Sequence, residues 1–169
     1  GSIFAHIGIT LFETVVSFAI VTASGICVAV LLWASRSASE ILEPYLVMLN
    51  SLPKSALAPM LIVWMGSHVH TIIAAAVSVA VFGSILTLHT GFLSMDPDKI
   101  RLIYALGGSK KDVLTKVLLP GSVPLILSNM KVNVGLCLVG VIIGEFLAAR
   151  RGLGYLIIYG SQVFSCVYI

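Results

Sequence analysis

The side chains that could do acid–base, nucleophilic or metal chemistry are few and widely spaced in this sequence. Its 169 residues include seven acidic residues, four histidines and three cysteines. No phosphate-cradling G-x-x-x-x-G-K-S/T loop and no G-x-S-x-G or H-E-x-x-H pattern occurs. His68 and His70 could share a metal ion, but no third ligand stands near them, so we interpret them as interfacial histidines. The sequence predicts no catalytic residue and no metal site, and the chain is not expected to be an enzyme.

The cysteines also lack a chemical pattern. Cys27, Cys137 and Cys166 lie in apolar surroundings without paired spacing. We interpret them as small core residues rather than disulfide partners or metal ligands. His89 closes an apolar run and is interpreted as a helix-end residue.

Three polar residues inside one long apolar run remain as candidates for a functional site. Asn129 and Asn133 are four residues apart and share one face of a helix, where they line a pathway or contact another helix. Glu145 lies about 30 Å along this helix from Pro124, at 1.5 Å per residue. A carboxylate inside a membrane helix is a functional candidate, although one so near the end could also be hydrated or paired with Arg150.

The composition is that of an integral membrane protein. Hydrophobic residues make up 59% of the chain and charged residues only 10%, with a mean hydropathy of +1.09, whereas about a quarter of the residues in soluble domains are charged. Long apolar runs without alternation predict an all-α polytopic bundle of about four to five membrane segments, with residues 1–169 forming one domain. The predicted segments are 11–34, 44–66, 71–90, 122–148 and a shorter run over 155–169.

The stretch from Ser37 to Gly66, which contains the predicted membrane segment 44–66, differs from the others because polar residues and prolines interrupt it. Pro44, Pro53 and Pro59 each remove a backbone donor and disfavour the helical conformation of the preceding residue. This pattern predicts a kinked or broken helix, which is tolerated in a membrane where it lines a cavity. Asn50, Pro53 and Pro59 are therefore candidate pathway-lining residues; the alternative is an interfacial helix followed by a core helix.

The only long charged segment, residues 96–120, predicts two helices joined by a glycine turn. Asp96 is a good N-cap, and Pro97 suits the first helical position. Gly107 and Gly108 can adopt a positive φ and stop this helix. Ser109 then begins an S-x-x-D capping pattern for a second helix, for which Pro120 is the predicted stop signal.

The distribution of basic residues predicts the orientation of these segments. With the 96–120 loop inside, eight basic residues fall at the inner side and two, Arg150 and Arg151, outside, which obeys the positive-inside rule. The loop is therefore expected in the cytosol. The eight inner residues are Arg36, Lys54, Lys99, Arg101, Lys110, Lys111, Lys116 and Lys131.

The 96–120 loop is also where the sequence resembles a known family. Arg101-Leu102-Ile103, three residues, Gly107, nine residues and Val117-Leu118-Leu119-Pro120 follow the spacing of the "EAA" loop of ABC importer permeases. Gly107, Leu119 and Pro120 match that pattern, whereas residues 101–103 replace its Glu-Ala-Ala. The segments LNSLPKSALAPMLIVWMG (49–66) and GEFLAARRGLGYLI (144–157) are similar to the nitrate/sulfonate/taurine branch of these permeases.

This resemblance implies an inner-membrane subunit of the type I importer kind. Its partners would be cytosolic ATPase subunits, an extracytoplasmic solute-binding protein, a second permease copy and the lipid bilayer. ATP and magnesium would sit on the ATPase, with no cofactor on this chain. In the family, a final membrane helix continues beyond the segment that corresponds to 155–169. The resemblance therefore implies that the sequence lacks the last membrane helix of full-length relatives, and it is expected to lack the first one as well. The residues expected to couple to the ATPase are Lys99, Ile100, Arg101, Leu102, Ile103, Tyr104, Gly107, Gly108, Val117, Leu119 and Pro120.

The resemblance implies an ATP-driven permease for nitrate, sulfonates, taurine or thiamine precursors, and two other functions are alternatives to it. A DNA-reading helix-turn-helix over 97–119 is disfavoured, because Ile100, Ile103 and Tyr104 form an apolar stripe that packs on protein, and no nucleic-acid partner is expected. A secondary transporter or channel without an ATPase could use the broken 44–66 helix, and co-purification with an ATPase would distinguish it.

Overall fold

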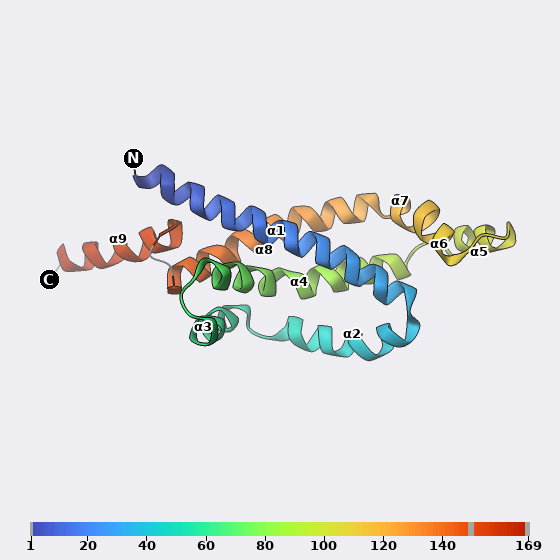
Figure 1. Cartoon of the computed structure of the whole chain (residues 1–169), viewed down its shortest axis with the longest axis horizontal. Helices are drawn as coiled ribbons and strands as arrows, with labels where there is room; N and C mark the ends of the chain where they lie inside the picture. The colour runs from blue at the N-terminus through green and yellow to red at the C-terminus, as the bar shows by residue number, and fades with distance from the viewer. Residues whose placement is uncertain (1, 149–150, 168–169) are drawn as a thin grey trace.

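Three long helices form the centre of the molecule. In the computed structural model, which describes residues 2–148 and 151–167, α1 (Ser2–Ala34), α4 (Val69–Leu93) and α8 (Val123–Ala148) are each long and apolar enough to span a membrane. They pack against one another along most of their length (Figure 1). The predicted all-helical membrane bundle is confirmed.

A broken helical segment packs on the outside of α4. It consists of α2 (Arg36–Ser51) and α3 (Lys54–Met65), which meet at an angle of 99°. Leu52 is extended, with ψ 142°, because the Pro53 ring disfavours the helical conformation in the residue before it. The break is thus at Pro53, one of the three prolines for which the sequence predicts a kink or a break, whereas Pro44 and Pro59 lie inside helices and end neither.

The broken segment also begins earlier than residue 44. The Ser35 hydroxyl accepts a hydrogen bond from the Ala38 amide and caps a new helix one residue after α1 ends. Residues 36–43 are therefore helical and belong to the broken segment, whose pattern of polar residues and prolines extends from Ser37 to Gly66 in the sequence. With the bent α2–α3 pair counted as one crossing, the described chain has up to four spans.

Small residues allow the long helices to approach closely. A Cβ atom added to Gly140 of α8 would lie 2.7 Å from the Ala76 Cα of α4, closer than a real contact permits. Cys137 is fully buried in the same contact, as predicted, but Cys27 is exposed. The prediction for Cys27 is wrong because the buried face of α1 follows the helical spacing 21, 25, 29 and 32, which turns residue 27 away. The side chain of Cys166 lies outside the described residues.

The two ends of the bundle carry different structures (Figure 1). The 96–120 loop, with α5 (Pro97–Ala105) and α6 (Lys110–Val113), projects from one end. The beginning of α1 and the helix α9 (Leu153–Val167) lie at the other end. The candidate site residues therefore separate into a loop site, a layer within the bundle and a polar cluster beside α9.

Candidate functional site

The first helix of the 96–120 loop begins and ends at the predicted signals. The Asp96 carboxylate accepts a hydrogen bond from the Asp98 amide at 3.0 Å, and Pro97 occupies the first turn. At the other end, the Gly107 amide donates to the Tyr104 carbonyl at 3.0 Å, and the Gly108 amide donates to the Ile103 carbonyl at 2.9 Å. This pair of bonds is a Schellman motif, and Gly107 has the positive φ of 79° that it requires.

A complete capping box starts the second helix. The Ser109 hydroxyl accepts from the Asp112 amide, while the Asp112 carboxylate accepts from the Ser109 amide at 2.8 Å. Hydrogen bonds from Lys116, at 2.9 Å, and from Ser109 hold the pKa of Asp112 well below its usual range. A lowered pKa stabilises the folded loop above the usual titration range of aspartate, so the box persists at neutral pH.

Pro120 does not stop this second helix, contrary to the prediction. The chain continues from α6 through a π-helical turn (Leu114–Leu118) and a short helix α7 (Leu119–Gly121). In the wider turn the Leu119 amide donates to the Leu114 carbonyl, five residues back. This spacing accommodates a proline that lacks an amide and would crowd a regular turn.

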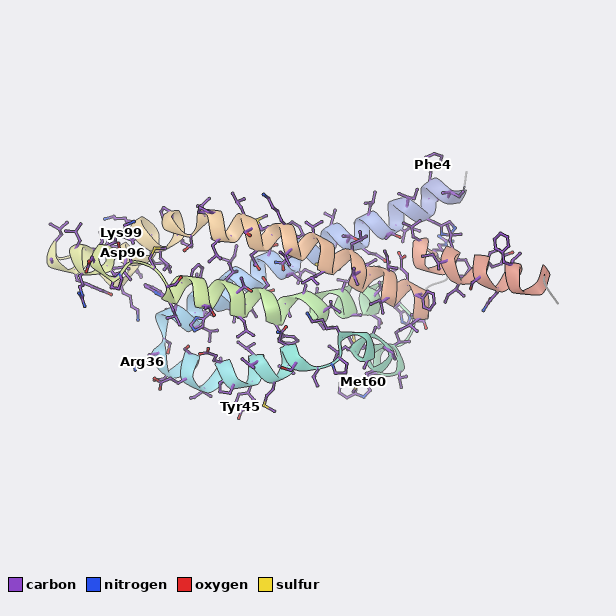
Figure 2. All side chains as sticks on the ribbon, turned by 180° about the vertical axis from the view of Figure 1, so that it is seen from behind. Phe4, Arg36, Tyr45, Met60, Asp96 and Lys99 are labelled. Carbon is purple, nitrogen blue, oxygen red and sulfur yellow. The ribbon has the colours of Figure 1, made fainter. Side chains whose placement is uncertain are left out.

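The surface of α5 and its C-cap residue, Leu106, expose large apolar side chains at the end of the molecule. Leu102 is 59% exposed, Tyr104 48% and Leu106 76%. The predicted stripe is only partly correct, because Ile100 and Ile103 are half-buried and Ile103 lines a cavity of about 290 Å³ against the second helix. Figure 2 shows Asp96 and Lys99 at this tip, at the end opposite Phe4.

The other predicted coupling residues lie on the same loop. Arg101 is exposed and pairs with Asp98 at 3.4 Å. The coupling role of all the predicted loop residues stays a prediction. Of the remaining residues, Lys99, Gly107 and Pro120 are exposed, whereas Gly108, Val117 and Leu119 are half-buried.

The second helix of the loop is fixed to the bundle. Leu118 is fully buried in a cluster with Leu88 and Phe92 of α4. The Lys110 ammonium donates to the Ala34 carbonyl at the end of α1 and lies 5.7 Å from the centre of the Trp33 ring. Motion of this helix would therefore reach α1 and α4 directly.

His89 joins the broken helix to α4 near the same end. Its side chain is 1% exposed, and its Nε2 atom hydrogen-bonds the Ser39 hydroxyl of α2 at 2.8 Å. The expectation of a helix-end histidine is wrong, because α4 continues to Leu93 and α2 covers this turn. Nothing in the sequence near residue 89 indicates Ser39, which is 50 residues away.

A layer of polar side chains lies between the helices. The amides of Asn129 and Asn133 both donate to the Ser84 hydroxyl of α4, at 2.7 and 3.0 Å. Asn129 and Asn133 share one face of α8, as predicted, and in the structure this face contacts α4. Asn50 of α2 lies against Gly83 of α4, which is the residue before Ser84. A pathway role for these residues, and for the exposed Pro53 and Pro59, stays a prediction.

Ser84→Ala is expected to destabilise the bundle by about 1–2 kcal/mol, because two buried amides lose their shared acceptor. Ser51→Ala is the matched control, since the Ser51 hydroxyl bonds only a carbonyl of its own helix. Equilibrium unfolding in mixed micelles measures both changes. Equal stability of the two variants would contradict the interhelical role of Ser84.

Glu145 is completely buried at the opposite end of α8. The Thr10 hydroxyl of α1 donates to one carboxylate oxygen at 2.6 Å, and the Gly154 amide donates to the other at 2.9 Å. The hydrated alternative is therefore wrong, and Arg150 lies outside the described residues. Neither donor is evident from the sequence around residue 145, although a buried carboxylate requires such donors.

Three successive amides at the start of α9 all donate to side chains of other helices. Gly152 donates to His6 Nδ1 at 2.8 Å, Leu153 to the Thr10 hydroxyl at 3.0 Å and Gly154 to Glu145. Gly152 has a positive φ of 109°, and any side chain there would collide with the Glu145 carboxylate. We call these residues, together with Glu13, the α9 polar cluster.

The fold and these sites define a polytopic helical membrane protein whose helical loop projects from one end of the bundle. Residues 16–165 match the family described as "Binding-protein-dependent transport system inner membrane component". Because the match covers most of the chain, the chain belongs to this family of inner-membrane transport components, which have no catalytic activity of their own. The resemblance of the 96–120 loop to importer permeases is thereby confirmed at the level of the family.

Individual relatives are similar over nearly the whole chain. The formylaminopyrimidine transport permease protein ThiX of Halalkalibacterium halodurans is 27% identical over 152 residues, covering 90% of this chain and 61% of the relative. The putative aliphatic sulfonates transport permease protein SsuC of Bacillus subtilis is 26% identical, with 96% and 59% covered. The taurine transport system permease protein TauC of Escherichia coli is 26% identical, with 92% and 57% covered. The chain thus spans about three fifths of the length of these relatives.

Proposed function

We propose that this chain is the membrane-spanning permease part of an ATP-driven importer that receives its solute from an external binding protein. The observation that carries this proposal is the family match over residues 16–165. The loop geometry supports it, because α5 presents exposed apolar side chains at the tip of the bundle, where a cytosolic partner can reach them.

In this function α5 docks into a cleft of an ATPase subunit. Leu102, Tyr104 and Leu106 supply apolar contacts, and each Å² of apolar surface that they bury contributes about 25 cal/mol before the cost of association. The ATPase, which holds ATP and magnesium, moves α5 when it closes. The second helix transmits this motion to α1 and α4 through Lys110 and Leu118. Two permease copies then alternate between inward-open and outward-open states.

The substrate is a small polar solute delivered at the opposite face, near residues 66–70 and 150–160. The relatives are named for formylaminopyrimidine, aliphatic sulfonates and taurine. We place the substrate of this chain in the same group of nitrate-like, sulfonate-like, taurine-like or thiamine-precursor-like solutes. Calorimetric titration of the cognate binding protein with one member of each class decides among them, and binding of none of them would refute this assignment.

The proposed orientation is tested by labelling in intact cells. After replacement of Cys27, Cys137 and Cys166, a single cysteine at Lys111 should resist an impermeant thiol reagent, whereas one at Arg151 should react. Both positions are exposed, so a difference in labelling reports sidedness rather than burial. Lys110 is unsuitable because it contacts α1. Equal labelling at the two positions would contradict the orientation.

Reconstitution distinguishes the importer from a secondary transporter or channel. Proteoliposomes that hold the permease, its ATPase and the binding protein should take up solute only with ATP and magnesium. Uptake by the permease alone, driven by a solute or ion gradient, would favour the secondary transporter.

A further inference from the structure

A cavity of about 400 Å³ lies at the corner where α1 passes into α2 and α2 packs on α4. Its lining includes Trp33, Arg36, Ser39, Glu40, His89 and Leu93. Figure 2 shows Arg36 at this corner. The apolar span of α1 ends at Ala34, and tryptophan and arginine at the end of such a span mark the membrane–water interface. The cavity therefore opens at the level of the lipid headgroups.

The imidazole of His89 forms part of the cavity wall and is incompletely hydrogen-bonded. Its side chain is 1% exposed, its Nε2 atom lies 2.8 Å from the Ser39 hydroxyl oxygen, and its Nδ1 atom has no hydrogen-bond partner within the described chain. Because proteins rarely leave a buried N–H group without an acceptor, we place the proton of neutral His89 on Nε2, where it donates to Ser39. The proton of the Ser39 hydroxyl is then free to donate to a ligand in the cavity.

The ion pair at the mouth of the cavity can also bind further groups. Arg36 Nε donates to Glu40 Oε1 at 2.9 Å, and the two side chains are 93% and 66% exposed. This bond uses one nitrogen of the guanidinium and one oxygen of the carboxylate. The Lys110 ammonium, 5.7 Å from the centre of the Trp33 ring, adds a second positive charge nearby. The mouth thus holds cationic donors beside an anionic acceptor.

We propose that this cavity binds the headgroup of a phospholipid that carries both a phosphate and a primary ammonium group, as phosphatidylethanolamine does. The phosphate accepts hydrogen bonds from Arg36 and Ser39, and the ammonium donates to the second oxygen of Glu40. An acyl chain follows the side chain of Leu93, which is 62% exposed.

The charge pattern of the cavity selects this headgroup over others. A phosphate without an amine, as in phosphatidylglycerol, would face the Glu40 carboxylate and be repelled by it. A quaternary ammonium, as in phosphatidylcholine, has no N–H group to donate to Glu40. The apolar wall formed by Trp33 and Leu93 suits a lipid rather than free phosphate.

A lipid at this place would brace α2 against the bundle. None of the residues of α2 is buried, so this helix is attached to the bundle only by partly exposed side chains. The bound headgroup would join the end of α1, the start of α2 and the wall of α4. The inference goes beyond the proposed function, because it requires the membrane and not the ATPase.

Fluorescence quenching by brominated lipids tests the site in the full chain. The chain has two tryptophans, and Trp64→Phe, at a position 89% exposed on α3, leaves Trp33 in the cavity wall as the only reporter. The reporter protein is placed in phosphatidylcholine vesicles that contain a small fraction of one brominated lipid. Brominated phosphatidylethanolamine should quench Trp33 as though enriched about threefold over brominated phosphatidylglycerol or phosphatidylcholine, the size of effect that partly exposed ion pairs give.

Substitutions in the reporter protein separate the two ends of the headgroup. Glu40→Gln should remove the preference for ethanolamine over glycerol, whereas Arg36→Gln should weaken quenching by both lipids. Arg101→Gln is the matched control, because it breaks an exposed Arg–Asp pair on α5, outside the cavity. It should change nothing. Equal quenching by the three brominated lipids, or an unchanged preference in Glu40→Gln, would overturn the proposal.

Competition in the unsubstituted cavity gives a second measurement that does not depend on the folding of a site variant. Unlabelled phosphatidylethanolamine should relieve the quenching by its brominated form, whereas inorganic phosphate should not. Relief by inorganic phosphate would identify a site for free anions and contradict the lipid assignment. Relief by phosphatidylglycerol as strong as that by phosphatidylethanolamine would contradict the role of the ammonium group.

Discussion

Gly107→Val is expected to abolish ATP-driven transport while leaving insertion into the membrane normal. Gly107 has a φ of 79°, which a β-branched residue adopts only at a cost of about 1–3 kcal/mol. A Cβ atom at this position would meet nothing within 4 Å, so the cost arises from the backbone and not from a collision. The Schellman turn would open and α5 would point in a different direction. Substrate-stimulated ATP hydrolysis and transport should fall together.

Gly107→Asn is the matched variant, because asparagine tolerates the left-handed conformation better than most residues. It should retain most of the coupled transport. Lys111→Ala, on the exposed face of the second helix, should change little. Full coupling in a Gly107→Val protein expressed at the normal level would exclude the role assigned to this turn.

The second large effect is expected at Gly154, where even one added carbon has no room. A Cβ atom there would lie 2.6 Å from the Ile142 carbonyl oxygen and 2.7 Å from the Phe146 amide nitrogen. These are backbone atoms of α8, which cannot turn aside as a side chain can. Gly154→Ala should therefore move α9 away from α8, break the bond to Glu145 and destabilise the protein by about 1–3 kcal/mol.

Gly135→Ala makes the same chemical change in an open place, since a Cβ atom on Gly135 meets nothing within 4 Å. Alanine favours a helix over glycine by about 1 kcal/mol, so this variant should be as stable as the wild type or slightly more stable. Thermal unfolding in detergent compares the two variants. Similar unfolding temperatures would show that α9 does not dock on α8 as described.

The features predicted well from sequence depend on short-range hydrogen bonds. The starts at Asp96 and Ser109 and the turn at Gly107 involve residues at most five positions apart. The residue types at these positions are therefore enough to predict the two helix starts and the turn. The break before Pro53 belongs to the same class, because proline restricts only its immediate neighbour.

The features that were missed depend on contacts between distant segments. The Glu145 partner Thr10 lies 135 residues away, and the Lys110 partner Ala34 lies 76 residues away. Hydrophobicity cannot assign such partners, because the apolar residues of the long helices are not concentrated on one face. The same limit explains Cys27, whose exposure depends on which face of α1 meets α4 and α8. At Pro120 the expected helix stop failed because a π-turn accommodates the proline.

Photo-crosslinking from the C-cap residue of α5 tests the central claim most directly. A photoreactive amino acid at Leu106, which is 76% exposed, should form a crosslink in intact cells to a protein that mass spectrometry identifies as a P-loop ATPase. The same amino acid at Trp64, which is 89% exposed on α3, should not capture that ATPase. Crosslinks from Leu106 that contain no P-loop ATPase would contradict the assignment of this chain as the permease of an ATP-driven importer.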